Sequence, residues 1–170
     1  MDTFSAARAA KDASIPLAAA DAELKNGALR SIADALLANT DRIVAANQLD
    51  LAQAQATDLA TPLLKRLKFD AKKLEGGVEG IRSLISLAEP VGETRLATEL
   101  DQGLELYQVS CPIGVIGVIF ESRPDALVQI STLCLKSGNA VLMKGGSEAI
   151  NTNRVLSEVI QMASEGVAGI

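Results

Sequence analysis

The spacing of apolar residues divides the chain into three regions. Over residues 1–90, apolar positions recur three and four apart on otherwise polar segments, which predicts α-helices. One such stripe contains Leu29, Ile32, Ala33, Leu36 and Leu37. Thr40 and Asp70 have side chains that suit the caps of two further helices. We therefore expect the first ninety residues to form a helical segment.

The period of the pattern changes after Pro90. Apolar and polar side chains alternate over residues 94–100 and again over 104–109, and Asp101-Gln102-Gly103 between them has the composition of a tight turn. This arrangement predicts a β-hairpin at 94–109, inside a segment that runs from 91 to 110. We expect the hairpin to be a projecting arm or the edge of a sheet.

Residues 111–170 follow a third pattern. The nearly continuous apolar run from Val115 to Phe120 is typical of a strand buried on both faces of a parallel sheet. Pro124 suits the first turn of a helix that Ser137-Gly138 would end, and residues 140–143 form a second apolar strand. A last helix is expected from about Glu148 to Ser164. The fold class is α/β, with a βαβ unit whose crossover is right-handed.

Two parallel strands form an unfinished sheet. One edge and much apolar surface would stay uncovered, so another chain, another copy or a continuation of the sheet should cover them. We find no internal repeat that could supply this cover.

Composition and charge exclude several functions. A chain of 170 residues with 48% hydrophobic and 22% charged residues indicates a globular domain. A net charge of −5, no Trp, one Tyr and three Phe make nucleic acid a poor partner. No apolar run approaches the roughly 18 residues of a membrane span, and residues 1–5 lack the features of a secretory signal. We expect no membrane segment and a cytoplasmic location.

The titratable residues offer little for catalysis. The sequence has no His, which excludes Ser-His-Asp and Cys-His catalysis within this chain. Two cysteines are too few for a disulfide framework, and a metal site is not expected. Cys134 shares an apolar helix stripe and should be buried, while Cys111 has nothing beside it in the sequence to activate its thiol. No catalytic residue is expected in this chain.

Two polar turns follow the two predicted strands. They are Glu121-Ser122-Arg123-Pro124 and Lys144-Gly145-Gly146-Ser147. Ligands of open α/β sheets bind outside the carboxyl ends of the strands. The arginine could clamp a phosphate or carboxylate, the serine could donate a hydrogen bond, and the two glycines would let the backbone approach a ligand. A solvated Glu–Arg ion pair and a flexible turn with a solvated lysine are the structural alternatives.

Residues 110–127 closely resemble the signature segment of the gamma-glutamyl phosphate reductase (glutamate-5-semialdehyde dehydrogenase) family of the aldehyde dehydrogenase superfamily. The segment reads Ser110-Cys111-Pro112-Ile113-Gly114-Val115-Ile116-Gly117-Val118-Ile119-Phe120-Glu121-Ser122-Arg123-Pro124-Asp125-Ala126-Leu127. The resemblance continues through Ser137-Gly138-Asn139 and Lys144-Gly145-Gly146, with Pro90-Val91-Gly92-Glu93 upstream. It implies that residues 1–170 are part of a Rossmann-like NADP-binding domain, and that the hairpin at 94–109 is an oligomerisation arm that joins identical subunits.

The resemblance also implies a reaction. Members of the family reduce gamma-glutamyl 5-phosphate with NADPH, and give glutamate 5-semialdehyde and phosphate on the route to proline. A cysteine thiolate displaces the phosphate, and the thioester then accepts hydride. That cysteine lies further along the family's chain and is matched by neither Cys111 nor Cys134, so we expect this chain alone to be inactive. Glutamate 5-kinase remains open as a pathway partner, and a non-catalytic assembly or regulatory module is the alternative function.

Individual positions carry further implications of the resemblance. Lys144 matches the superfamily's lysine that reaches the adenosine ribose or its 2′-phosphate. Ser147 stands where NAD-preferring aldehyde dehydrogenases often have a glutamate, and the absence of that carboxylate favours NADPH. Ser122 stands where general aldehyde dehydrogenases have the oxyanion-stabilising asparagine. We interpret Glu121 to Pro124 as contacts to substrate, phosphate or cofactor.

Overall fold

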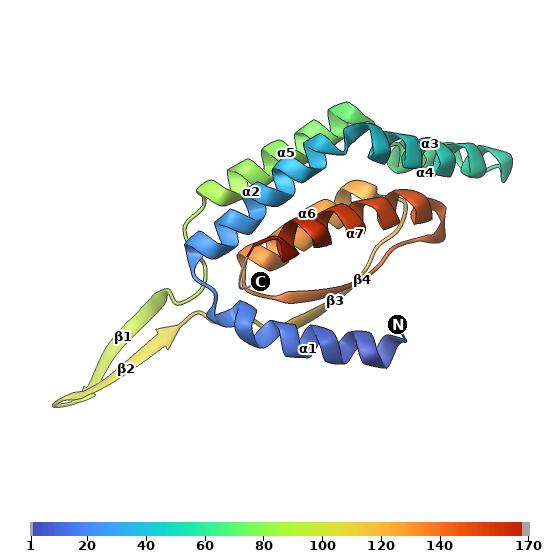
Figure 1. Cartoon of the computed structure of the whole chain (residues 1–170). Coiled ribbons are helices and arrows are strands. Elements are labelled where there is room, and N and C mark those ends of the chain that lie inside the picture. Colours follow the sequence, from blue (N-terminus) through green and yellow to red (C-terminus); the bar gives the residue numbers. More distant parts are fainter. Residues whose placement is uncertain (1, 168–170) are drawn as a thin grey trace.

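A computed structural model gives the structure of residues 2–167 (Figure 1). The elements in chain order are α1 (Thr3–Ala19), α2 (Ala22–Ala38), α3 (Thr40–Ala56), α4 (Thr61–Leu67), α5 (Ala71–Ser86), β1 (Thr94–Asp101), β2 (Leu104–Val109), β3 (Val115–Ile119), α6 (Pro124–Lys136), β4 (Ala140–Lys144), the 3-10 turn η1 (Ser147–Ala149) and α7 (Ile150–Glu165). The helical opening, the hairpin and the βαβ unit are confirmed. Within residues 2–167, the helices lack the combination of length and apolar character that a membrane crossing requires.

The elements stack in layers (Figure 1). Helices α2 and α5 pack on α6 and α7, which cover one face of the β3–β4 pair, while α1 lies against the opposite face. The apolar stripes of the helices meet in one cluster, whose fully buried members include Leu29, Ile32, Leu36, Leu74, Ile81 and Leu156. The core therefore lies mainly between helices, and the sheet is at its margin.

Strands β3 and β4 are parallel and only partly covered. Their register runs from Val115 opposite Ala140 to Ile119 opposite Lys144. Both strands are half-buried, and the side chain of Ile119 is 78% exposed. The prediction that β3 is buried on both faces is therefore wrong for residues 2–167. The physical reason is that the helices pack mainly on β4, so the faces of β3 are covered only in part.

Helix ends test the capping expectations. Asp70 begins α5 as predicted, because its carboxylate accepts the N–H of Lys73 at 3.1 Å. The cap predicted at Thr40 is wrong by one residue: Asn39 occupies that position, and the Thr40 hydroxyl donates to a carbonyl of the preceding helix. Helix α6 ends at Ser137 as predicted, with Gly138 in the left-handed region at φ +70°.

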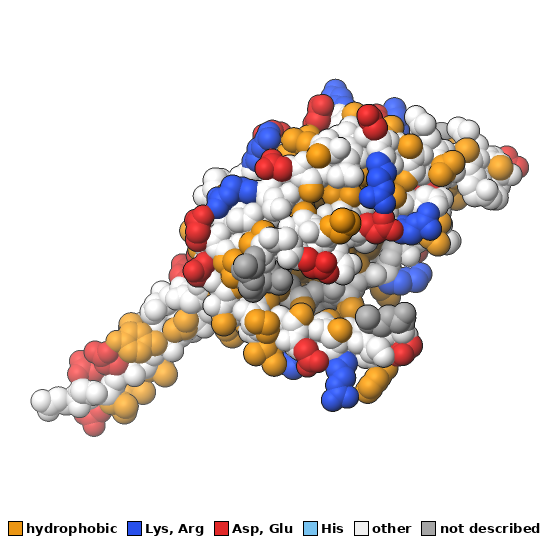
Figure 2. Space-filling model, in the orientation of Figure 1, with side chains coloured by type: hydrophobic (Ala, Val, Ile, Leu, Met, Phe, Trp, Pro, Cys, Tyr) orange, Lys and Arg blue, Asp and Glu red, His pale blue; other side chains and the backbone are white. Residues whose placement is uncertain are grey.

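The hairpin projects from the body of the molecule (Figures 1 and 2). Its strands pair antiparallel, with Thr98 opposite Leu106 and Ala97 opposite Tyr107. Every residue of both strands is exposed. Hydrophobic side chains nevertheless cover much of the arm in Figure 2, and Leu96, Leu100, Leu104, Leu106 and Tyr107 are each more than half exposed. The predicted hairpin is confirmed, and both of its faces are open.

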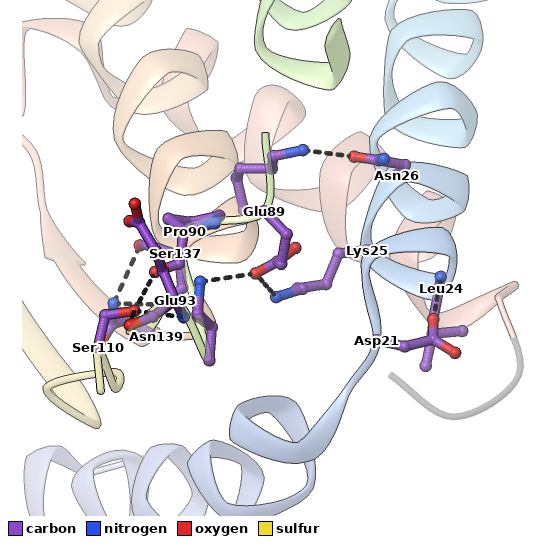
Figure 3. Close-up of polar contacts among 12 residues, drawn as sticks. Asp21, Leu24, Lys25, Asn26, Glu89, Pro90, Glu93, Ser110, Ser137 and Asn139 are labelled. Carbon is purple, nitrogen blue, oxygen red and sulfur yellow. Dashed lines mark hydrogen bonds and ion pairs between the residues drawn. The ribbon is translucent and has the colours of Figure 1, made fainter. Parts of the chain in front are cut away.

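A polar network fixes the base of the hairpin to the helical body (Figure 3). The Lys25 ammonium on α2, 1% exposed, pairs with the Glu89 carboxylate in the segment leading to β1. The Ser110 hydroxyl after β2 donates to the Pro90 carbonyl at 2.7 Å. The Asn139 side chain accepts the N–H of the residue before β3 at 2.9 Å. An ion pair and hydrogen bonds therefore hold the base of the arm to the body.

Candidate functional site at the carboxyl ends of β3 and β4

The strand register brings the two predicted polar turns to the same edge of the sheet. Ile119, the last residue of β3, lies opposite Lys144, the last residue of β4. The Phe120 N–H donates to the Lys144 carbonyl at 3.1 Å and closes the ladder. Residues 121–124 and 145–147 therefore leave the sheet side by side, at the edge where ligands of open α/β sheets bind.

A carboxylate from η1 links the two turns. One Glu148 carboxylate oxygen accepts both the backbone N–H and the hydroxyl of Ser122, the latter at 2.7 Å. Ser122 is 4% exposed and has φ +44°, a left-handed conformation that costs a non-glycine residue about 1–2 kcal/mol. Hydrogen bonds to a charged acceptor offset that cost. Both donors of Ser122 are thus engaged by Glu148.

Glu148 stays ionised despite its partial burial. Burial alone would raise the pKa of this carboxyl group, but the hydrogen bonds from Ser122 and the positive charge of Lys144 outweigh it, and the pKa lies below its ordinary value. Sequence reasoning missed this residue. The signal was present, since a glutamate directly follows the Lys144–Ser147 turn, but its target lies 26 residues earlier in the chain.

The two glycines of the turn lie against the ends of other side chains, which would have to move to make room for a larger residue. A Cβ on Gly145 would overlap the amide of Asn153 and press on the Phe120 ring. A Cβ on Gly146 would overlap the carboxylate of Glu148. The turn therefore fits closely against α7 and η1, which fixes the position of Lys144 and Ser147 relative to those elements.

A cavity of about 430 Å³ opens beside this turn. Its wall combines apolar side chains from β3, α6 and β4 with polar groups, and its lining is Phe120, Leu127, Met143, Lys144, Gly145, Gly146, Ser147, Ile150, Asn153, Arg154 and Ser157. Among the residues described, the buried Asn153 Oδ1 has no hydrogen-bond partner. An apolar wall, a cation and an unpaired acceptor are groups that a phosphorylated nucleoside would use. These residues could therefore hold the adenosine part of a nicotinamide dinucleotide.

A carboxylate from α3 occupies part of the amino end of α7. The Asp50 carboxylate, 2% exposed on α3, accepts the backbone N–H groups of Asn151 and Thr152 and also the Thr152 hydroxyl at 2.6 Å. These are the helix-end donors that bind the pyrophosphate in many dinucleotide folds. A phosphate at this helix end would therefore compete with Asp50 for these two N–H groups.

The only cation of the other turn, residues 121–124, is Arg123. The Arg123 guanidinium pairs with Asp125 at 2.9 Å, and not with Glu121 as the ion-pair alternative would have it. The hydrogen bond and the charge of Asp125 raise the pKa of Arg123. The arginine side chain is 54% exposed, so the pair is solvated and contributes little to stability. Arg123 thus keeps donors that could face an anionic ligand.

Neither cysteine lies at these turns. Burial raises the pKa of the Cys134 thiol near the end of α6, which makes it a poor nucleophile, as the sequence indicated. Cys111 is exposed, and it precedes β3 at the end of the strand opposite to the site.

The fold defines the broad class of protein. A probable aldehyde dehydrogenase from Listeria monocytogenes superposes on 94% of this chain with a TM-score of 0.68 at 14% identity, and this chain covers 32% of it. At that identity the likeness concerns the fold alone. The βαβ unit and its helical surroundings are thus those of an aldehyde-dehydrogenase-type fold.

Sequence similarity identifies the family within that class. The gamma-glutamyl phosphate reductase of Ruminiclostridium cellulolyticum is 66% identical over 152 residues, which are 89% of this chain and 35% of that protein. The crystal structure of gamma-glutamyl phosphate reductase from Saccharomyces cerevisiae matches 94% of this chain at 43% identity and a TM-score of 0.91, and 41% of that chain is covered. No protein-family model matches. The chain belongs to the gamma-glutamyl phosphate reductase family and spans just over a third of the length of these relatives, at their amino-terminal end.

Proposed function

We propose that this chain is the NADPH-binding part of an enzyme that reduces gamma-glutamyl 5-phosphate to glutamate 5-semialdehyde and phosphate. The single observation that supports it best is the cavity beside the Lys144–Ser147 turn, where a cation, an unpaired acceptor and an apolar wall converge. NADPH supplies the hydride when it is bound. This chain's residues bind the adenosine half and shield it from water.

The charge arrangement supports NADPH over NADH. Lys144 is exposed and lines the cavity, and Ser147 in the same lining carries a hydroxyl and not a carboxylate, which would repel a 2′-phosphate bound there. Glu148, one residue further on, would oppose this preference if its side chain turned into the cavity. Its hydrogen bonds to Ser122 hold it toward the other turn.

The turn at residues 121–124 supports a role in binding the acyl phosphate substrate. Arg123 is half exposed at the same edge of the sheet, and a guanidinium can form two parallel bonds to a phosphate. Ser122 cannot donate to an oxyanion while its hydroxyl is bonded to Glu148. We therefore propose that Arg123, and not Ser122, provides the donor toward an anionic substrate.

The nucleophile must come from outside these residues. Cys134 is buried and Cys111 lies at the wrong end of β3, so the complete reaction requires a cysteine-bearing catalytic domain. We expect the 170-residue chain to bind cofactor weakly and to show no turnover. Substrate-dependent oxidation of NADPH at an ordinary enzymatic rate by this chain alone would contradict the proposal.

Isothermal titration of the chain with NADPH and with NADH tests the cofactor assignment. We expect NADPH to bind more tightly, and K144M to remove most of the difference because it removes the charge but keeps much of the length of the side chain. K72M, a matched change on the exposed surface of α5, should leave the difference intact. Equal affinity for the two cofactors, or no binding of either, would overturn the assignment.

A second role, in assembly, is favoured by the hairpin. Its leucines are more than half exposed although hydrogen bonds hold the base of the arm to the body, and isolated proteins rarely keep such apolar surface uncovered. We propose that the hairpin joins this chain to a second copy or to a full-length subunit.

Sedimentation of the chain, alone and mixed with a full-length reductase of the family, tests this role. A self-associating or mixed species that disappears in the double variant L104S/L106S is the expected result. A monomer under both conditions would contradict it.

A further inference from the structure

One face of α7 forms a wall of the cavity. Ile150, Asn153, Arg154 and Ser157 all line it. Their spacing of three, four and seven residues from the first places them on one side of a helix. The Lys144–Ser147 turn lines the same cavity, so a ligand there contacts both the turn and the helix.

Asn153 presents an unpaired acceptor to this cavity. Its amide packs against the α-carbon of Gly145, and within residues 2–167 its buried Oδ1 accepts no hydrogen bond. Buried polar atoms are rarely left without a partner, and an exception at a cavity wall points to a missing donor. A ribose hydroxyl is a donor of suitable size. In NADPH the 3′-hydroxyl remains free to act as one, because only the 2′-oxygen carries phosphate.

Arg154 supplies a cation beside Asn153. Its guanidinium is exposed and donates to the Asn151 side chain at 3.2 Å, and it forms no ion pair with any described residue. Most of its five N–H donors are therefore free for a ligand. The only charged side chains in the lining are Lys144 and Arg154, among the residues described, since Glu148 is turned away.

We propose that α7 completes the site for a 2′-phosphorylated adenosine: Asn153 Oδ1 accepts the ribose 3′-hydroxyl, and Arg154 binds the 2′-phosphate together with Lys144. This proposal rests on the cofactor function proposed above and assigns its specificity to two residues of the helix. Asp50 already accepts the N–H groups of Asn151 and Thr152, so Lys144 and Arg154 are the positively charged groups of the lining that this proposal assigns to the phosphate.

Titration of the 170-residue chain with adenosine 2′,5′-bisphosphate and with 5′-AMP tests it, since both probes need only the adenosine half of the site. We expect R154M to weaken the bisphosphate about tenfold or more, as loss of a charge-assisted contact does. Binding of 5′-AMP should change less than about twofold. R82M on α5 is the matched control, because Arg82 is a half-exposed arginine paired only with its helix neighbour Glu79.

N153D separates recognition from packing. The aspartate keeps an acceptor for the ribose but brings a negative charge to the phosphate. It should leave 5′-AMP within about threefold and weaken the bisphosphate about tenfold. If the wild-type chain prefers the bisphosphate and R154M and N153D both keep that preference, the role of α7 is wrong while the cofactor function stands. If the wild-type chain binds neither probe, the cofactor function itself fails.

Discussion

The helical body and the hairpin arm of this molecule differ in whether their apolar side chains are buried. In α2, α5, α6 and α7 the apolar residues occupy one stripe per helix, and the stripes meet in a core where Leu29 and Leu156 are fully buried. In β1 and β2 apolar residues occur on both faces, and all of them are exposed. The helices thus bury most of their apolar stripes within the chain, whereas the apolar side chains of the arm stay open to solvent.

The β3–β4 pair lies between these extremes. Helices cover part of both faces, yet Ile119 is 78% exposed at the carboxyl edge where the two turns meet. This two-stranded sheet therefore leaves apolar surface open at the end of the strands where we propose that the cofactor binds. The three regions therefore differ in how much of their apolar surface the chain itself covers: most in the helices, part in the β3–β4 pair and little in the arm.

The largest expected effect is in the core of the body. L29A removes a side chain with no exposed surface and leaves a cavity, and should lower the free energy of unfolding by about 2–5 kcal/mol. Urea denaturation followed by circular dichroism measures it. A loss below about 1 kcal/mol would show that α2 does not pack on the core as described.

A smaller effect is expected at the amino end of α7, which Asp50 caps. D50N keeps the shape of the side chain but replaces a charged acceptor with an amide whose N–H₂ faces the backbone donors of α7. The free energy of unfolding should fall by about 1.5–3 kcal/mol, the range for hydrogen bonds to charged groups. D34N on the exposed face of α2 is the control and should be nearly neutral. Equal effects of the two changes would contradict the capping role of Asp50.

The link between the two turns should depend on pH. Because the folded-state pKa of Glu148 is lower than in the unfolded chain, its ionised form stabilises the fold above the ordinary value near 4.5, and this contribution is lost as the pH falls through the folded-state pKa. We expect the stability advantage of the wild type over E148Q to be constant near neutrality and to shrink below about pH 4.5. Denaturation midpoints of both proteins between pH 3 and pH 7 measure it. A stability advantage of the wild type that grew as the pH fell would contradict the predicted direction of the pH dependence.

The smallest effect is expected in the arm. L104A changes a residue that is 56% exposed, and in the monomer it should alter the free energy of unfolding by less than about 0.5 kcal/mol. Measured beside L29A, it compares the same substitution in the two regions. A loss of similar size for both would mean that the arm folds against the body.

Local chemistry explains why much of the fold could be predicted from the sequence. The cap at Asp70, the stop at Ser137-Gly138 and the turn of the hairpin depend on residues a few positions apart, and each is confirmed. The cap at Thr40 was wrong because α3 begins without a side-chain cap: Asn39 holds that position and its amide donates to a carbonyl of α2 instead. The predicted burial of β3 was wrong because an apolar run shows that a strand can be buried, but not which elements pack against it.

The site was predictable in part for the same reason. The two turns follow from strand ends, and the register brings them together. The contacts that shape them join distant segments: Glu148 reaches Ser122 across 26 residues, and Asp50 caps α7 across about a hundred. Contacts between such distant residues leave no periodic pattern in the sequence. The wall formed by Asn153 and Arg154 becomes visible only when the helix is placed beside the turn.

Amide chemical-shift mapping with adenosine 2′,5′-bisphosphate tests most directly whether the ligand binds at the carboxyl ends of β3 and β4 and not at the arm. We predict shifts that concentrate at residues 144–147 and 153–157, with the hairpin at 94–109 unmoved. Shifts spread along the hairpin, or confined to helices α2 to α5, would contradict the assignment of this edge as the cofactor site.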